Sequence, residues 1–184
     1  MNHQAKLLST GQVIDIFDDV FSFKEMSEFY IFIQSSYYKL GSRATEFVDT
    51  TGYTTNWQSQ YNPDDINKLG FFNNPKLQPM SSVIGNRERL VSWVNCFIPS
   101  TYVAPHCDAI GMTGVKTFMY YVNTEWKKEQ GGETLFYNSN MDPEVIVEFK
   151  PNRIVIFDSE TPHKPLQHFH SPYPYRFTFV SVFK

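Results

Sequence analysis

The sequence predicts a mainly β protein with N-terminal helices (α+β), built around a double-stranded β-helix, or jelly roll. Three observations lead to this fold class. Aromatic residues make up 17% of the chain, and such side chains favour strands and thick sheet cores. Short β-rich runs separated by Gly, Pro and Asn follow one another closely after Arg87. The gaps between these runs leave no room for crossover helices. We expect strands at 88–98, 101–106, 115–123, 133–137, 144–149, 153–158, 162–166 and 175–183.

The N-terminal part is expected to contribute a short strand and two helices. Residues 13–17 form an apolar run typical of a strand. Ser22 and Glu25 match the capping box that begins a helix, and apolar residues follow at helical spacing: Met26, Phe29, Tyr30, Ile33 and Tyr37. Asn62 followed by Pro63 and two acids indicates a second, short helix that ends near Gly70. Residues 41–61 are polar and predict a loop that could hold an extended segment.

Length and composition indicate a single domain over residues 1–184, with residues 1–86 as helical support and substrate-side loops and residues 87–184 as the jelly-roll core. The net charge of −3 argues against a nucleic-acid partner. No signal peptide or membrane span is evident. Cys96 and Cys107 form no disulfide or zinc pattern. We therefore expect a cytoplasmic protein whose partner is a small-molecule or peptide substrate.

His106, Asp108 and His163 are the candidate metal ligands. On an extended strand, positions i and i+2 point to the same face, so His106 and Asp108 can reach one ion. Two His and one carboxylate form the facial set that leaves open positions on non-haem Fe(II). Because an H-x-D motif also arises by chance, it needs the third ligand to be informative. His168 and His170 are rivals of His163, although both run into a Pro-rich loop.

Arg176 and Thr178 share one face of the last expected strand. A guanidinium binds a carboxylate through two parallel hydrogen bonds, and a nearby hydroxyl adds a further donor. This pair is therefore a candidate site for a dicarboxylate, although an Arg on a terminal strand is more often solvated.

The order of these motifs resembles that of the Fe(II)/2-oxoglutarate-dependent oxygenase superfamily, and within it the prolyl hydroxylases. The resemblance covers roughly residues 90–183. It rests on the following segments: Tyr102-Val103-Ala104-Pro105-His106-Cys107-Asp108, residues 118–126, Gly131-Gly132-Glu133-Thr134-Leu135-Phe136, residues 151–157, Pro162-His163, and Arg176-Phe177-Thr178.

The resemblance implies that His106, Asp108 and His163 bind Fe(II), and that O₂ and 2-oxoglutarate are cosubstrates. Arg176, with Tyr121 and Thr178, would hold the distal carboxylate of 2-oxoglutarate. Strand parity agrees for Tyr121, and it places Asn95 and Phe97 on the face that we expect to line the same cavity. Substrate contacts are expected from three aromatic residues: Phe97, Tyr102 and Trp57.

We therefore expect a hydroxylase that acts on an unactivated C–H bond of a prolyl or other amino-acid substrate. Asp108 favours hydroxylation, because the related halogenases lack this carboxylate and bind halide in its place. Phe97 stands where prolyl hydroxylases often carry Tyr, which weakens the transfer of prolyl specificity. Two rivals remain: a non-catalytic jelly-roll protein that binds a metal or a sugar, and a cupin-type enzyme that uses more His ligands.

Overall fold

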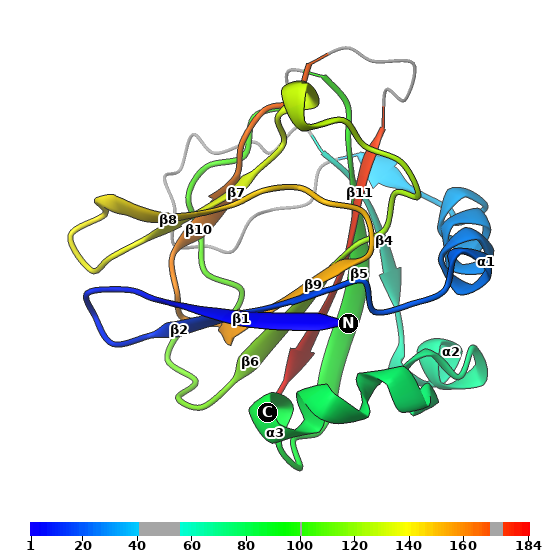
Figure 1. Cartoon of the computed structure of the whole chain (residues 1–184), viewed down its shortest axis with the longest axis horizontal. Helices are drawn as coiled ribbons and strands as arrows, with labels where there is room; N and C mark the ends of the chain where they lie inside the picture. The colour runs from blue at the N-terminus through cyan, green and yellow to red at the C-terminus, as the bar shows by residue number, and fades with distance from the viewer. Residues whose placement is uncertain (41–55, 100, 170–174) are drawn as a thin grey trace.

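The computed structural model describes residues 1–40, 56–99, 101–169 and 175–184, in which two antiparallel sheets face each other (Figure 1). The larger sheet has eight strands in these residues, in the spatial order β1 (Asn2–Leu7), β2 (Val13–Asp18), β9 (Arg153–Asp158), β6 (Lys116–Tyr121), β11 (Arg176–Phe183), β5 (Arg89–Phe97), β4 (Trp57–Tyr61) and β3 (Lys39–Leu40). The smaller sheet has three strands there: β10 (His163–Pro165), β7 (Thr134–Tyr137) and β8 (Pro143–Val147). This arrangement confirms the predicted jelly roll.

Helical segments cover one face of the larger sheet. They are α1 (Phe23–Gln34), α2 (Pro63–Lys68), η1 (Phe71–Asn73), η2 (Pro75–Met80) and α3 (Ser81–Ile84), and a further short helix, η3 (Lys128–Gln130), precedes β7. Strand β6 shows how the sheet serves two cores. Phe118 and Tyr120 pack into the cluster beneath the helices, whereas Met119 and Tyr121 pack into the cluster between the sheets. Successive side chains of a strand alternate between its faces, so both faces of this strand are buried.

The capping box of α1 forms as predicted. The Glu25 backbone N–H donates to the Ser22 hydroxyl, and the Glu25 carboxylate accepts from the Ser22 backbone N–H. The helix ends at Gln34, so Tyr37 lies beyond it and is 80% exposed instead of extending the apolar face. The predicted second helix is α2, which Asn62 caps, and Gly70 follows it in a left-handed conformation at φ 67°.

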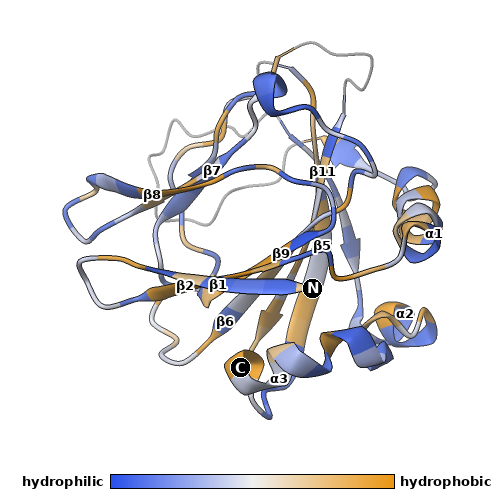
Figure 2. Ribbon diagram, in the orientation of Figure 1, coloured by the Kyte–Doolittle hydropathy of each residue, from blue (hydrophilic) through white to orange (hydrophobic). Residues whose placement is uncertain are grey.

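Three strands, β1, β3 and β4, were not predicted. Strand β1 is an exposed edge strand, hydrophilic along most of its length (Figure 2), so no apolar alternation indicates it. Strand β4 lies in the stretch that was expected to be a loop with an extended segment, and residues 41–55 of that stretch lie outside the described residues. The larger sheet therefore draws strands from residues 2–61 as well as from the C-terminal half.

The strand predicted at 101–106 is wrong. In residues 101–106 the backbone makes only an isolated bridge, between His106 and His163. Pro105 has no N–H to donate to a neighbouring strand, which disfavours a continuous ladder at this point. Among the described residues, no helix is long and apolar enough to cross a membrane.

The turn before β9 is stabilised by hydrogen bonds from the Asn152 side chain, and a substitution there tests their contribution. Its φ is 63°, its side-chain oxygen accepts from the Phe21 backbone N–H (2.8 Å), and its amide donates to the Phe21 carbonyl (2.8 Å). Because Asn152→Ala leaves both buried backbone groups without partners and strains the turn, we expect it to lower the free energy of unfolding by about 2–4 kcal/mol in urea denaturation. Asn152→Gly relieves the strain and should lose less. A change in Asn152→Ala below about 0.5 kcal/mol would contradict this assignment.

Candidate active site

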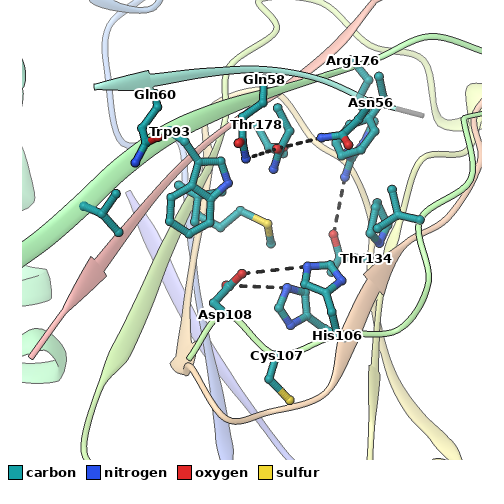
Figure 3. A pocket seen from close by; sticks show the side chains of 18 residues that line it. Asn56, Gln58, Gln60, Trp93, His106, Cys107, Asp108, Thr134, Arg176 and Thr178 are labelled. Atoms are coloured by element: carbon teal, nitrogen blue, oxygen red, sulfur yellow. Dashed lines mark hydrogen bonds and ion pairs between the residues drawn. The ribbon is translucent and has the colours of Figure 1, made fainter. Parts of the chain in front are cut away.

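A cavity of about 270 Å³ opens between the two sheets (Figure 3). Its walls come from β4, β5, β6 and β11 of the larger sheet, from β7 and β10 of the smaller sheet, and from the loop that contains residues 103–108. The side chains that line it include, from the expected site residues, Asn95, Phe97, His106, Asp108, His163, Arg176 and Thr178.

His106, Asp108 and His163 meet at the base of this cavity. One potential ligand atom from each lies within 4.8 Å of the others. Asp108 is central: its carboxylate oxygens lie 3.9 Å from His106 Nε2 and 3.7 Å from His163 Nε2. His168 is not part of this group; it is buried, and its ring lies 5.4 Å from that of Trp126. His170 lies outside the described residues.

The two imidazoles are fixed by hydrogen bonds to the backbone. The backbone N–H of His106 donates to the His163 carbonyl and the N–H of His163 donates to the His106 carbonyl, both at 2.9 Å. Each ring also places Nδ1 at 3.0 Å from the carbonyl two residues earlier, that of Ala104 or Thr161. This contact assigns the ring proton to Nδ1 and leaves the Nε2 lone pair directed at the shared point. Burial lowers the pKa of His163 to about 4, so this ring is neutral at pH 7.

Asp108 is oriented by a chain of two hydroxyls. Thr117 Oγ1 lies 2.9 Å from Asp108 Oδ2 and 2.8 Å from Ser159 Oγ, and both hydroxyls are fully buried. A carboxylate can only accept, so Thr117 donates to Asp108 and Ser159 donates to Thr117. The backbone N–H of Asp108 donates to the Ser159 carbonyl at 2.9 Å. Side chain and backbone of the carboxylate are thus both held.

Arg176 is a buried cation with one unused donor. It is 1% exposed, its Nε donates to the Gly132 carbonyl (2.9 Å), and Nη1 has no partner among the described residues. The guanidinium lies 4.6 to 5.6 Å from the ring centroids of Phe149, Phe97 and Tyr121. Burial lowers the pKa of Arg176 to about 10, which still leaves it charged at neutral pH. Such a group is suited to an anion that enters the cavity.

The second glycine of the Gly-Gly-Glu motif allows Arg176 to come this close. Gly132 adopts φ +83°, and a Cβ added there would lie 3.1 Å from Arg176 Cδ and 3.4 Å from His168 Cβ. A larger residue would therefore have to displace the guanidinium. The motif that was recognised in the sequence has a steric reason in this contact.

The other expected cosubstrate residues lie near Arg176. Thr178 is paired with Asn95 on one side and Tyr121 on the other, so the three share one row across the sheet. Thr178 and Asn95 line the cavity. Tyr121 lies behind it, and its hydroxyl donates to Thr134 Oγ1 at 2.9 Å. Thr134, which was not predicted as a site residue, lines the cavity. Arg176 Nη2 lies 3.5 Å from Thr134 Oγ1, so Thr134 connects Tyr121 to Arg176.

The expected substrate residues are placed less uniformly. Phe97 lines the cavity next to Arg176, but Tyr102 and Trp57 are not among the lining residues and are 54% and 38% exposed. Gln58, the neighbour of Trp57, lines the cavity instead, because strand parity turns the two side chains to opposite faces of β4. The sequence analysis missed four further cavity residues, which lie on β4, on β5 or just before β4: Asn56, Gln58, Gln60 and Trp93.

A jelly roll with two His, one Asp and a buried Arg around one cavity is typical of non-haem Fe(II) oxygenases that bind a carboxylate cosubstrate. The model of the 2OG-Fe(II) oxygenase superfamily matches residues 92–183, half of the chain, and the chain belongs to this superfamily. It is a 2-oxoglutarate- and Fe(II)-dependent oxygenase, which requires Fe(II), 2-oxoglutarate and O₂. The predicted enzyme class and cofactors are thereby confirmed. No curated protein sequence gives a significant match.

Solved structures with similar folds include prolyl hydroxylases at low sequence identity. A Pseudomonas putida prolyl-4-hydroxylase has a TM-score of 0.66 and 16% identity, over 93% of this chain and 92% of that chain. A Trichoplax adhaerens prolyl hydroxylase in complex with a hypoxia inducible factor peptide fragment has a TM-score of 0.67 and 19% identity, over 95% and 84%. The viral collagen prolyl hydroxylase of Paramecium Bursaria Chlorella virus-1, solved with 2OG, has a TM-score of 0.61 and 16% identity, over 92% and 95%.

The hydroxyl chain behind Asp108 predicts a measurable effect on metal affinity. Thr117→Val keeps the shape of the side chain but removes the donor to Asp108, so we expect binding of Co²⁺ to weaken about 10- to 100-fold in anaerobic calorimetric titrations. Thr117→Ser is the matched control, because it keeps the hydroxyl and should stay within about threefold of the wild type. Equal affinities for the Val and Ser variants would show that this hydrogen bond does not orient the carboxylate.

Proposed function

We propose that this oxygenase hydroxylates an unactivated C–H bond of a prolyl or other amino-acid substrate, with Fe(II) held by His106, Asp108 and His163. The observation that carries the proposal is that these three side chains line a single cavity with Arg176, whose Nη1 has no partner in the described residues. Two of the similar structures support the amino-acid substrate, since they are prolyl hydroxylases and one contains a peptide fragment.

The donor set fits Fe(II). His106, Asp108 and His163 would hold Fe(II) through two imidazole nitrogens and one carboxylate, a ligand set that would leave coordination positions for O₂ and 2-oxoglutarate. When bound, Fe(II) supplies the activation of O₂, in which one oxygen atom passes to 2-oxoglutarate as it forms succinate and CO₂, and the other enters the substrate C–H bond. The protein's task is to keep the ligands in place. The paired backbone of His106 and His163 and the Thr117 contact to Asp108 perform that task.

Arg176 positions the cosubstrate in this proposal. Its Nη1, buried and without a partner in the described residues, would donate to the distal carboxylate of 2-oxoglutarate. Thr134 would add a second donor, because its oxygen already accepts from Tyr121 and its own proton is left for the cavity. Thr178 and Asn95 would contact the carbon chain of the cosubstrate from the larger sheet.

The two rival functions have less support. Nothing in the comparisons favours a non-catalytic metal- or sugar-binding protein, and such a protein has no need of a buried, unpaired Arg in its cavity. A cupin-type site with more His ligands would need His168 near the other imidazoles, but that ring packs on Trp126 instead.

The proposed iron site is tested by spectroscopy. Anaerobic addition of Fe(II) and 2-oxoglutarate to the wild type should give a weak visible charge-transfer band, and Asp108→Ala should lose it because the carboxylate ligand is gone. Asp142→Ala, which removes an exposed carboxylate, is the control and should keep the band. A folded, iron-loaded wild type without the band would refute the proposed site.

The role of Arg176 predicts a separate change in cosubstrate binding. Arg176→Gln should raise the Kd for 2-oxoglutarate at least about tenfold, because a charge-assisted pair is lost, while the affinity for Co²⁺ stays within about threefold. Calorimetry with each ligand measures both quantities on one protein preparation. If Arg176→Gln binds 2-oxoglutarate as the wild type does, the carboxylate is held elsewhere.

A further inference from the structure

The cavity has a wall of carboxamides that the chemistry of the iron and the cosubstrate does not use. Gln58 and Gln60 line it from β4, where they alternate with the buried Ser59 and Tyr61, and Asn56 lines it from the position just before this strand (Figure 3). Alternation along a strand puts the three amides on one face. The face of β4 that lines the cavity therefore carries hydrogen-bonding groups, where an inward-facing strand usually carries apolar side chains.

The hydrogen bonds of these amides show which of their atoms remain available. Asn95 Oδ1 accepts from Asn56 Nδ2 at 3.0 Å and from Gln58 Nε2 at 3.2 Å. The Gln58 amide is thereby oriented, and its Oε1 has no partner in the described part of the chain. Gln60 makes no side-chain hydrogen bond there, so both its oxygen and its NH₂ group are available. The wall offers an oriented acceptor beside a group that can donate and accept.

An apolar surface lies directly beside this wall. Trp93 is paired with Gln60 in the register of β4 and β5 and faces the cavity in the same row as Val180 and Met119. Figure 3 shows the indole of Trp93 between Gln60 and Asp108. A substrate that contacts the two Gln side chains can therefore rest its apolar part on Trp93, on the side of the cavity that holds the metal ligands.

The cavity offers no further charged group to a substrate among the described residues. Among the described lining residues, the ionisable side chains are Arg176, Asp108, His106, His163 and Cys107. The first is assigned to 2-oxoglutarate and the next three to iron, and the Cys107 thiol donates to the Glu160 carbonyl at 3.2 Å. A substrate ammonium or carboxylate in this cavity would lose its hydration without gaining a counter-charge.

We propose that the substrate presents an uncharged amide to Gln58 and Gln60 and packs its apolar part on Trp93. The amide N–H donates to Gln58 Oε1, and a second amide or carbonyl pairs with Gln60. The two Gln positions are about 6.8 Å apart along the strand, the repeat of alternate residues in an extended peptide. The substrate class is thus an amide-linked amino acid, in a peptide or an acylated or amidated form, and not a free zwitterion. This inference rests on the proposed function.

Matched substrate pools test the inference. One pool contains the N-acetylated, C-amidated forms of the apolar and cyclic amino acids, the second contains the same amino acids free, and the third contains neutral mono- and disaccharides. Each is incubated with the Fe(II)-loaded enzyme, 2-oxoglutarate and O₂, and products that have gained one oxygen atom are counted by mass spectrometry. We expect at least about tenfold more product from the capped pool. Equal or greater product from the free amino acids or the sugars, or no product from the capped pool, would overturn the proposal.

Variants of the wall give a second readout. Gln58→Leu and Gln60→Leu each remove the amide at similar size, and each should raise KM for the best capped substrate about tenfold with a smaller change in kcat. Gln4→Leu is the control, since Gln4 is exposed on β1 at the opposite edge of the sheet. Unchanged KM values in both wall variants would show that the amides do not bind substrate.

Binding of 2-oxoglutarate separates this inference from the proposed function. The charge-transfer band and the Kd for 2-oxoglutarate should be the same in the wild type and in both Leu variants, which also shows that these variants are folded. If the wild type lacks the band, the proposed function fails. If the band is present but the capped pool is not oxidised, only the amide inference fails.

Discussion

The active site depends on one set of backbone contacts, in which the loop that carries His106 and Asp108 is bound along the segment that leads into β10. His106 and His163 exchange two hydrogen bonds, and the N–H groups of Asp108 and Ala109 both donate to the Ser159 carbonyl. Because both sets of hydrogen bonds are made by the backbone, they fix the backbone positions of the proposed ligands whatever the side chains do. The three ligand atoms come together only when segments distant in the sequence have docked.

The larger sheet combines a structural core and a reactive cavity through the alternation of its side chains. On β11, Phe177 and Phe179 pack beneath the helices, while Arg176, Thr178 and Val180 face the other way and line the cavity. Aromatic side chains cover the face beneath the helices; for example, the ring centroids of Phe29 and Phe179 are 5.3 Å apart. A one-residue slip in the register of this strand would exchange the two faces, so the core and the cavity depend on the same register.

Much of the fold was predictable because most strands carry the apolar pattern that a two-sided core requires. The missed strands show where this signal fails. Strand β1 is exposed at an edge, and β4 turns Gln58 and Gln60 toward a polar cavity, so neither shows apolar alternation. Apolar alternation is absent where a strand faces solvent or a functional cavity, and the prediction of the sheet was incomplete at these strands.

The site itself was predictable to a different extent. The proposed ligand set was predicted from its motifs, and the structure brings these residues together although the expected strand at 101–106 is absent and His106 and Asp108 lie in a loop. Thr117 and Thr134 gave no signal, because their roles depend on which residues lie across the sheet, a relation that spacing along the chain does not contain. Gly132 was recognised only as part of a motif. The reason for a glycine at this position is the close approach of Arg176, which only the three-dimensional structure shows.

Arg176 also links binding of the cosubstrate to folding. Burial of this cation raises the free energy of the folded chain, its Nη1 has no hydrogen-bond partner in the described residues, and an anion that binds only the folded form lowers that free energy by mass action. A dicarboxylate held at Arg176 is in this sense part of the core for as long as it is bound. The melting temperature of the protein should then rise with the concentration of 2-oxoglutarate.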